Sequence, residues 1–154
     1  MQFSFITKQQ VEQLIKEKTP VEDFILIDVR EPSEFNSSEL PPIHSSAYNI
    51  PVGDLGPAFL TLDNKQFKQT YGFEKPNVHS DSTLASSGYG GVSHAFISSK
   101  AKKSIFGDDE TISKKIIVYC KLGGRAQMAA QTLSELGIEN VYCYKGSASE
   151  WWSK

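Results

Sequence analysis

The sequence predicts an α/β domain built on a parallel β-sheet. Two observations carry this prediction. Residues 24–29 (FILIDV) are almost continuously apolar, which is typical of a strand buried on both faces of a parallel sheet. Residues 115–144 contain a strand, a tight turn, a helix and a second strand in that order, which makes a βαβ unit with a right-handed crossover.

Length and composition favour one domain over residues 1–154. Hydrophobic residues make up 39% and charged residues 22% of the 154 residues, which is enough for one core and short for two. The net charge of -2 lacks the basic excess that nucleic-acid binding needs. No apolar run reaches the roughly 18 residues of a membrane span. The N-terminus has no leader-like apolar segment, so we expect an intracellular protein, with the cytoplasm favoured and the mitochondrion as the alternative.

The first half of the chain alternates helices and strands. Thr7 and Gln10 form a capping-box pattern that begins the first helix. The next elements expected are a strand at 24–29, a short helix at 31–35, a short strand at 47–51, and a helical stretch at 59–71 with Phe59, Leu60, Phe67 and Tyr71 facing inward.

A change of composition predicts a loop insertion at about 77–113. Ser, Gly, His and Lys dominate its first part, and residues 87–91 (SGYGG) have no periodicity, which indicates a long loop. The insertion either has no role of its own or contacts a partner. His79 and His94 lie within it, and we interpret both as solvated loop residues.

The βαβ unit places Cys120 at the end of a strand and directly before a helix. The strand is residues 115–119 (KIIVY), the helix is residues 125–136, and Gly137 suits the helix end. Ligands of open α/β sheets bind beyond the carboxyl ends of the strands. Cys120 is therefore a candidate site residue, although a plain buried cysteine at a strand end fits the spacing equally well.

The loop after Cys120 has the composition of an anion cradle. Backbone N–H groups of residues 121–125 and the helix N-terminus can surround a negative charge, and Gly123 and Gly124 allow the tight curl. Lys121 and Arg125 add positive charge, which favours the thiolate form of a cysteine. The same N–H groups would stabilise a negatively charged persulfide.

Four stretches, taken in order, resemble the rhodanese (sulfurtransferase) family over nearly the whole chain. They are residues 26–35 (LIDVREPSEF), 48–51 (YNIP), 120–125 (CKLGGR, of the form C-x-x-G-x-R) and 144–151 (YKGSASEW). The resemblance implies the rhodanese-like fold, a five-stranded, mostly parallel sheet with helices on both faces. Residues 67–76 (FKQTYGFEKP) further resemble the eukaryotic single-domain, heat-shock-protein-like branch.

The resemblance also implies a thiosulfate sulfurtransferase that works by double displacement. Cys120 would take a sulfur atom from thiosulfate or a persulfide donor and pass it to cyanide or a thiol, which includes a thiol on a protein acceptor. The reaction needs no metal and no organic cofactor. The family pattern assigns substrate binding to Lys121, Leu122, Gly123, Gly124 and Arg125.

The family pattern assigns supporting roles to further residues. Asp28 and Arg30 would brace the loop and the rim of the site, or simply form an ion pair or a cap at a strand end. Arg125 would hold the loop or the donor anion. We interpret Trp151 as packing, Cys143 as a buried inert thiol and His44 as structural, although residues 40–46 (LPPIHSS) replace the family's usual glycine-rich stretch.

Two other functions compete with sulfur transfer. Cysteine-based phosphatases and arsenate reductases of this fold hold an oxyanion in a C-x5-R loop, whereas Arg125 here follows Cys120 by five positions and gives the shorter C-x4-R. Loop length therefore favours sulfur. The second competitor is a rhodanese-like protein-binding module, but such modules lack the cysteine that this chain keeps.

Overall fold

The computed structural model describes residues 3–20, 22–76 and 114–153. The predicted insertion at about 77–113, with His79 and His94, lies outside the described residues. None of the described helices is long and apolar enough to cross a membrane. In chain order the elements are β1 Ser4–Phe5, α1 Lys8–Glu17, β2 Phe24–Asp28, α2 Pro32–Phe35, β3 Tyr48–Asn49, α3 Val52–Thr61, α4 Asn64–Tyr71, β4 Lys115–Tyr119, α8 Gly124–Glu135, β5 Val141–Cys143 and α9 Ser147–Trp151.

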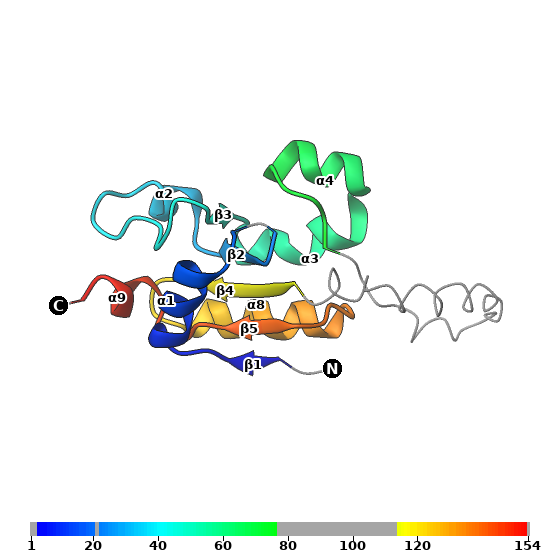
Figure 1. Cartoon of the computed structure of the whole chain (residues 1–154). Coiled ribbons are helices and arrows are strands. Elements are labelled where there is room, and N and C mark those ends of the chain that lie inside the picture. The colour runs from blue at the N-terminus through cyan, green and yellow to red at the C-terminus, as the bar shows by residue number, and fades with distance from the viewer. Residues whose placement is uncertain (1–2, 21, 77–113, 154) are drawn as a thin grey trace, which may run out of the picture.

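The strands form one five-stranded sheet in the order β1-β5-β4-β2-β3. Every pairing of neighbouring strands in this described sheet is parallel, so the predicted fold class is confirmed. Strands β2 and β4 lie in the middle, and Asp28 at the end of β2 pairs with Tyr119 at the end of β4. The residues that follow these two strands therefore leave the sheet side by side (Figure 1).

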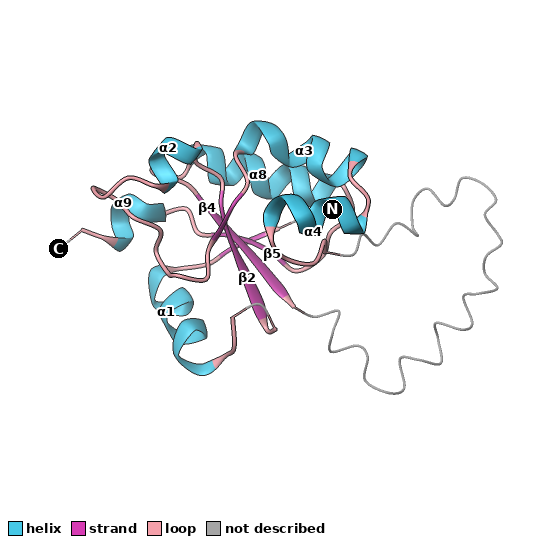
Figure 2. Ribbon diagram, turned by 90° about the horizontal axis from the view of Figure 1, so that it is seen from above, coloured by secondary structure: helices cyan, strands magenta, loops and turns pink. Residues whose placement is uncertain are grey.

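Helices cover both faces of the sheet (Figure 2). All of β2 is buried, as its apolar sequence predicts. On one face Ile27 and Val118 belong to a core with α3, α4 and α8. On the other face Leu26 and Ile117 belong to a second core that includes Val11 of α1. Alternate residues of each central strand thus enter opposite cores, because successive side chains of a strand point to opposite faces.

The first helix begins as its sequence predicts. The N–H of Gln10 donates to Thr7 Oγ1 at 3.1 Å, and the N–H of Thr7 donates to Gln10 Oε1 at 2.9 Å. This reciprocal capping box satisfies two N–H groups that a helix start otherwise leaves without a partner.

The stretch 59–71 is not a single helix. It contains the end of α3 and all of α4, because Asp63 caps a new helix: its Oδ1 accepts the N–H of Gln66 at 2.8 Å. The expectation that Leu60 faces inward is wrong, since this side chain is 71% exposed. Two short helices in different directions do not share one apolar stripe. Phe59 and Phe67 are buried, as expected.

Candidate active site

Cys120 lies directly beyond the last residue of β4 and is 1% exposed. Its N–H donates to Ser147 Oγ at 3.0 Å, and its carbonyl accepts the N–H of Ala148 at 3.0 Å. Both bonds tie the cysteine backbone to the start of α9. The two central strands, α9 and α2 all reach this end of the sheet (Figure 1). Cys120 is therefore fixed at the edge where open α/β sheets bind their ligands.

Two backbone N–H groups point at the sulfur of Cys120. The N–H of Gly123 donates to Sγ at 3.0 Å and the N–H of Ala126 at 3.3 Å. The predicted cradle of residues 121–125 is thus matched at Gly123, whereas Ala126 was missed. Ala126 is the third residue of α8, and the first N–H groups of a helix have no partner within it. Together with the positive end of the helix dipole, these donors suit an anionic sulfur.

Of the two loop glycines, only Gly123 is required by the backbone. It has a φ of +112°, and a Cβ there would lie 2.5 Å from the carbonyl oxygen of Lys145. A Cβ added to Gly124, the first residue of α8, would meet no atom within 4 Å. The expectation that both glycines enable the curl therefore holds for Gly123, where a left-handed conformation and a close approach coincide.

The remaining loop residues face the surface. Lys121 and Leu122 are exposed, and Leu122 reaches 72%. The carbonyl of Lys121 accepts the N–H of Ser149 at 3.0 Å, which fastens the loop to α9. The side chains of Lys121 and Leu122 are thus free to meet an incoming molecule, and their binding role stays a prediction.

Ser147 is a site residue that the sequence analysis missed. Its Oγ accepts the N–H of Cys120, donates to the carbonyl of Tyr144 at 3.0 Å, and lies 3.7 Å from Cys120 Sγ. The residue is fully buried, with a φ of +59°. A non-glycine residue in this conformation is uncommon and marks a constrained position. The available signal was a hydroxyl directly after Gly146, where the chain passes from β5 into α9.

Arg125 pairs with a residue of the first signature stretch. Its two terminal nitrogens donate to the two carboxylate oxygens of Glu34 of α2, at 2.7 and 3.0 Å. Each side chain is about one-third exposed, at 32% and 31%. Hydrogen bonding by Arg125 lowers the pKa of Glu34 to about 2. Arg125 thus links the start of α8 to α2, and its two expected roles, holding the loop or holding the donor anion, stay predictions.

Asp28 and Arg30 form a buried ion pair beside the loop. Their side chains are 0% and 1% exposed, and Arg30 Nη2 donates to Asp28 Oδ2 at 2.7 Å. Arg30 Nη1 donates to the carbonyl of Leu40 at 2.8 Å. The amide of Asn49 donates to the carbonyls of both Asp28 and Arg30. The pair therefore anchors the chain after β2, and its expected bracing of the loop stays a prediction.

Cys143 and His44 both have structural surroundings. Cys143 is fully buried, and its burial, together with the charge of Cys120, raises its pKa to about 11. It is therefore a thiol at neutral pH. His44 Nδ1 lies 2.9 Å from Ser46 Oγ and accepts the N–H of Ser46, which orders its own loop.

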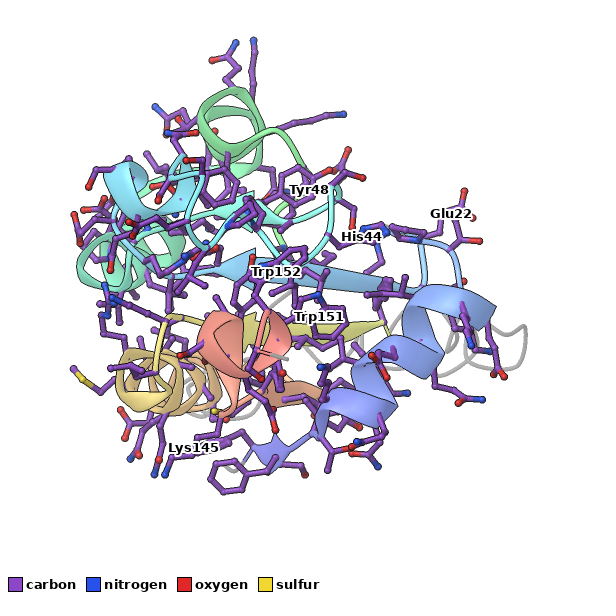
Figure 3. The ribbon with its side chains drawn as sticks, turned by 90° about the vertical axis from the view of Figure 1, so that its left-hand side faces the viewer. Glu22, His44, Tyr48, Lys145, Trp151 and Trp152 are labelled. Carbon is purple, nitrogen blue, oxygen red and sulfur yellow. The ribbon has the colours of Figure 1, made fainter. Side chains whose placement is uncertain are left out.

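Trp151, the last residue of α9, and Trp152, which follows it, make separate contacts. Trp151 packs edge-to-face on Tyr144 at 6.0 Å between ring centres. The indole N–H of Trp152 donates to the carbonyl of Pro41 at 2.8 Å. Figure 3 shows Trp151 and Trp152 on one side of α9, with Lys145 on the other. Within the described residues, no group of three or more His, Cys, Asp or Glu side chains could hold a metal ion.

Comparison with known proteins places the chain in a family. The model of the rhodanese-like domain matches residues 7–154. A Schizosaccharomyces pombe protein that carries the name of a mitochondrial thiosulfate sulfurtransferase is 31% identical over 146 residues, which are 95% of this chain and 75% of that protein. The mitochondrial thiosulfate sulfurtransferase RDL2 of Saccharomyces cerevisiae is 28% identical over 96% of this chain and 72% of its own length.

Solved structures agree with the fold. The crystal structure of the Saccharomyces cerevisiae single-domain sulfurtransferase RDL2 aligns with a TM-score of 0.61 at 26% identity, covering 98% of this chain and 89% of that one. The human single-domain sulfurtransferase TSTD1 aligns with a TM-score of 0.62 at 20% identity, covering 96% and 93% of the two chains. A parallel sheet, a cysteine cradled at the end of its central strand and a family match over nearly the whole sequence lead to one conclusion: the chain belongs to the rhodanese-like domain family.

Proposed function

We propose that this protein is a thiosulfate sulfurtransferase that carries sulfur as a persulfide on Cys120. The observation that carries the proposal is the convergence of two donors on Cys120 Sγ, the N–H groups of Gly123 and Ala126. Charged acceptors form stronger hydrogen bonds than neutral ones, so these donors favour the thiolate that the reaction requires. The sulfurtransferase names of two relatives support the proposal.

The reaction has two displacements. In the first, the thiolate of Cys120 attacks the outer sulfur of thiosulfate, the sulfur–sulfur bond of the donor breaks, and sulfite leaves with the bonding electron pair. In the second, a thiolate or cyanide attacks the outer sulfur of the persulfide. The thiolate of Cys120 then leaves, and the product is a new persulfide or thiocyanate. Electrons and atoms balance without a metal or an organic cofactor.

The cradle serves both steps. Before sulfur is loaded, the negative charge lies on Cys120 Sγ, where the N–H groups of Gly123 and Ala126 donate. When the persulfide is discharged, the same charge returns to Sγ as the leaving group. Donors fixed in place before the reaction stabilise this charge without reorganisation. Lys121 and Leu122, exposed on the loop, are the proposed contacts for the donor and the acceptor.

A phosphatase activity is the weaker alternative. Only four residues separate Cys120 from Arg125, and both terminal nitrogens of Arg125 already bond to Glu34. This arrangement gives a tetrahedral oxyanion less room and fewer free donors than a C-x5-R loop would. Hydrolysis of an aryl phosphate much faster than sulfur transfer from thiosulfate would reverse this ranking.

We also propose a sulfur acceptor, a branch of the family and a cellular location for this protein. The acceptor is cyanide or a thiol, either a small molecule or a cysteine of another protein. Residues 67–76 support the eukaryotic single-domain, heat-shock-protein-like branch. We propose an intracellular location; the mitochondrial names of two relatives support the mitochondrion, the alternative to the cytoplasm that the sequence favours.

Intact-mass measurement after exposure to thiosulfate tests the proposal. We expect the protein to gain the mass of one sulfur atom, and cyanide to remove it. Cys120→Ser should gain nothing, whereas the matched variant Cys143→Ser should gain the same mass as the unaltered protein. A sulfur atom retained by Cys120→Ser would move the chemistry to Cys143. A gain by neither protein would remove the proposed activity.

A further inference from the structure

The ion pair between Glu34 and Arg125 places a carboxylate beside the sulfur-carrying loop. Both terminal nitrogens of Arg125 bond to Glu34. Arg125 is the second residue of α8, and the next residue, Ala126, donates its N–H to Cys120 Sγ. Two of the five N–H groups of this guanidinium, together with its charge, are therefore engaged by Glu34 of α2.

Glu34 is held in this position by its own helix. Its Oε1 accepts the N–H of Glu31 at 2.8 Å as well as the Nη1 of Arg125 at 2.7 Å. Because both oxygens of the carboxylate are engaged, it cannot turn away from the guanidinium without losing bonds. Its low pKa, about 2, keeps it charged across the physiological range.

The ion-paired charges around the cysteine cancel one another. The charge of Arg125 is cancelled by Glu34 at contact distance, and Asp28 and Arg30 cancel one another. Two exposed cations remain, Lys121 on the loop and Lys145, whose carbonyl and Cγ lie close to Gly123. Thiosulfate carries two negative charges, so its binding depends on local charge more strongly than the binding of a neutral donor does.

We propose that Glu34 is a specificity-determining residue that weakens the binding of small anionic sulfur donors by neutralising Arg125. The donor class favoured by this arrangement is the hydropersulfide of an organic thiol, R–S–SH, which carries less charge than thiosulfate. The thiolate of Cys120 would attack its outer sulfur, the sulfur–sulfur bond would break, and R–S⁻ would leave with the electron pair while the proton stays on the outer sulfur. This inference rests on the proposed sulfur transfer.

Alkylation of Cys120 by iodoacetate and by iodoacetamide measures the local charge directly. The two probes have similar shapes, but only iodoacetate is charged, so the ratio of their rates reports the field at the sulfur. Measurements use a Cys143→Ser background, which leaves Cys120 as the only cysteine of the chain. For Glu34→Gln we expect the iodoacetate-to-iodoacetamide ratio to rise about threefold to tenfold, as expected for removal of one charge several ångströms away.

Two control variants separate charge from structure. Glu34→Asp keeps the charge but shortens the side chain, so its ratio should stay near that of the unaltered protein. A purely structural effect would change both Glu34 variants alike. Glu135→Gln removes a charge at the far end of α8, roughly 15 Å along the helix from Arg125, and should leave the ratio unchanged.

The rate of sulfur transfer provides a second measurement of the effect of Glu34. Because thiosulfate is a dianion, the free-energy effect on it should be twice that on iodoacetate. We therefore expect kcat/KM for thiosulfate, relative to a hydropersulfide donor, to rise about tenfold or more in Glu34→Gln. Salt should reduce both the rise in the alkylation ratio and the rise in relative kcat/KM for thiosulfate, since it screens exposed charges. In the unaltered protein, salt should alter the alkylation ratio less, because the pair is already neutral.

The outcomes keep this inference distinct from the proposed function. An unchanged or lower alkylation ratio in Glu34→Gln overturns the role of Glu34, even if sulfur transfer is intact. An equal rise in Glu34→Asp or in Glu135→Gln also overturns it. If the unaltered protein transfers no sulfur from either donor, the proposed function fails, while the alkylation ratio still decides the electrostatic role of Glu34.

Discussion

Replacing Gly123 by alanine tests the geometry of the cradle. The φ of +112° is unfavourable for any L side chain, and the new Cβ would lie 2.5 Å from the carbonyl oxygen of Lys145 and 2.8 Å from its Cγ. The Cγ belongs to a flexible side chain that can turn away, but the carbonyl belongs to the backbone and can move only if the chain around Lys145 moves with it. A left-handed backbone costs a non-glycine residue about 1–2 kcal/mol. With the contact added, we expect Gly123→Ala to lower the free energy of unfolding by roughly 2–4 kcal/mol.

The same substitution should damage sulfur loading. Relief of the contact must move the loop, and the N–H of Gly123 is 3.0 Å from Cys120 Sγ. A hydrogen bond to a charged group contributes about 1.5–3 kcal/mol. Since 1.4 kcal/mol corresponds to about a tenfold change in rate, the rate of persulfide formation should fall about tenfold to a hundredfold. Urea unfolding measures the stability, and single-turnover mass analysis with thiosulfate measures the loading rate.

Gly124→Ala is the matched control. Nothing lies within 4 Å of the Cβ it would add, and the residue begins α8 without a positive φ. Alanine favours a helix over glycine by about 1 kcal/mol at most, so stability should stay equal or rise slightly and loading should be unchanged. Equal damage by both variants, or a harmless Gly123→Ala, would refute the assignment of the curl to Gly123.

Three further outcomes follow from the charges and thiols of the site. The ion pair lowers the pKa of Glu34 from 4.5 to about 2, so it stabilises the fold fully above about pH 4.5 and loses that effect as the pH falls through 2. Urea unfolding should show that Glu34→Gln is less stable than the unaltered protein by about 1 kcal/mol at neutral pH. This difference should vanish near pH 2. Asp28→Asn leaves Arg30 buried without its counter-charge, so thermal unfolding should reveal a loss of about 3–5 kcal/mol, and a loss below 1 kcal/mol would contradict the buried pair. Cys143 has a pKa near 11, so iodoacetamide should alkylate it slowly at pH 7. Its alkylation rate in the Cys120→Ser variant should be far lower than the rate for Cys120 in the unaltered protein. Comparable rates would show that Cys143 is accessible.

The sequence did not predict strand β1 or the boundary between α3 and α4. Strand β1 has only two residues, both exposed, so it leaves no apolar pattern. The boundary between α3 and α4 depends on one cap at Asp63, which a pattern of apolar spacing over 59–71 does not register. By contrast, β2 and α8 were predicted because each carries its own period: β2 is apolar throughout, and α8 shows one face of small and apolar residues.

Sequence alone determined the parts of the site that are contiguous in the chain. One continuous segment contains Cys120, Gly123 and the helix that follows them. The order of strand, turn and helix in this segment already implies N–H groups directed at the cysteine. Local backbone geometry is sufficient for that inference, since all the groups lie within seven residues.

Only the tertiary structure decided which distant side chains complete the site. Glu34 meets Arg125 from 91 positions away, and Ser147 meets Cys120 from 27 positions away. These contacts arise because parallel pairing brings the carboxyl ends of β2, β4 and β5 to one edge of the sheet. Spacing along the chain carries no information about such contacts, because the distance between two side chains across a sheet depends on strand order and register.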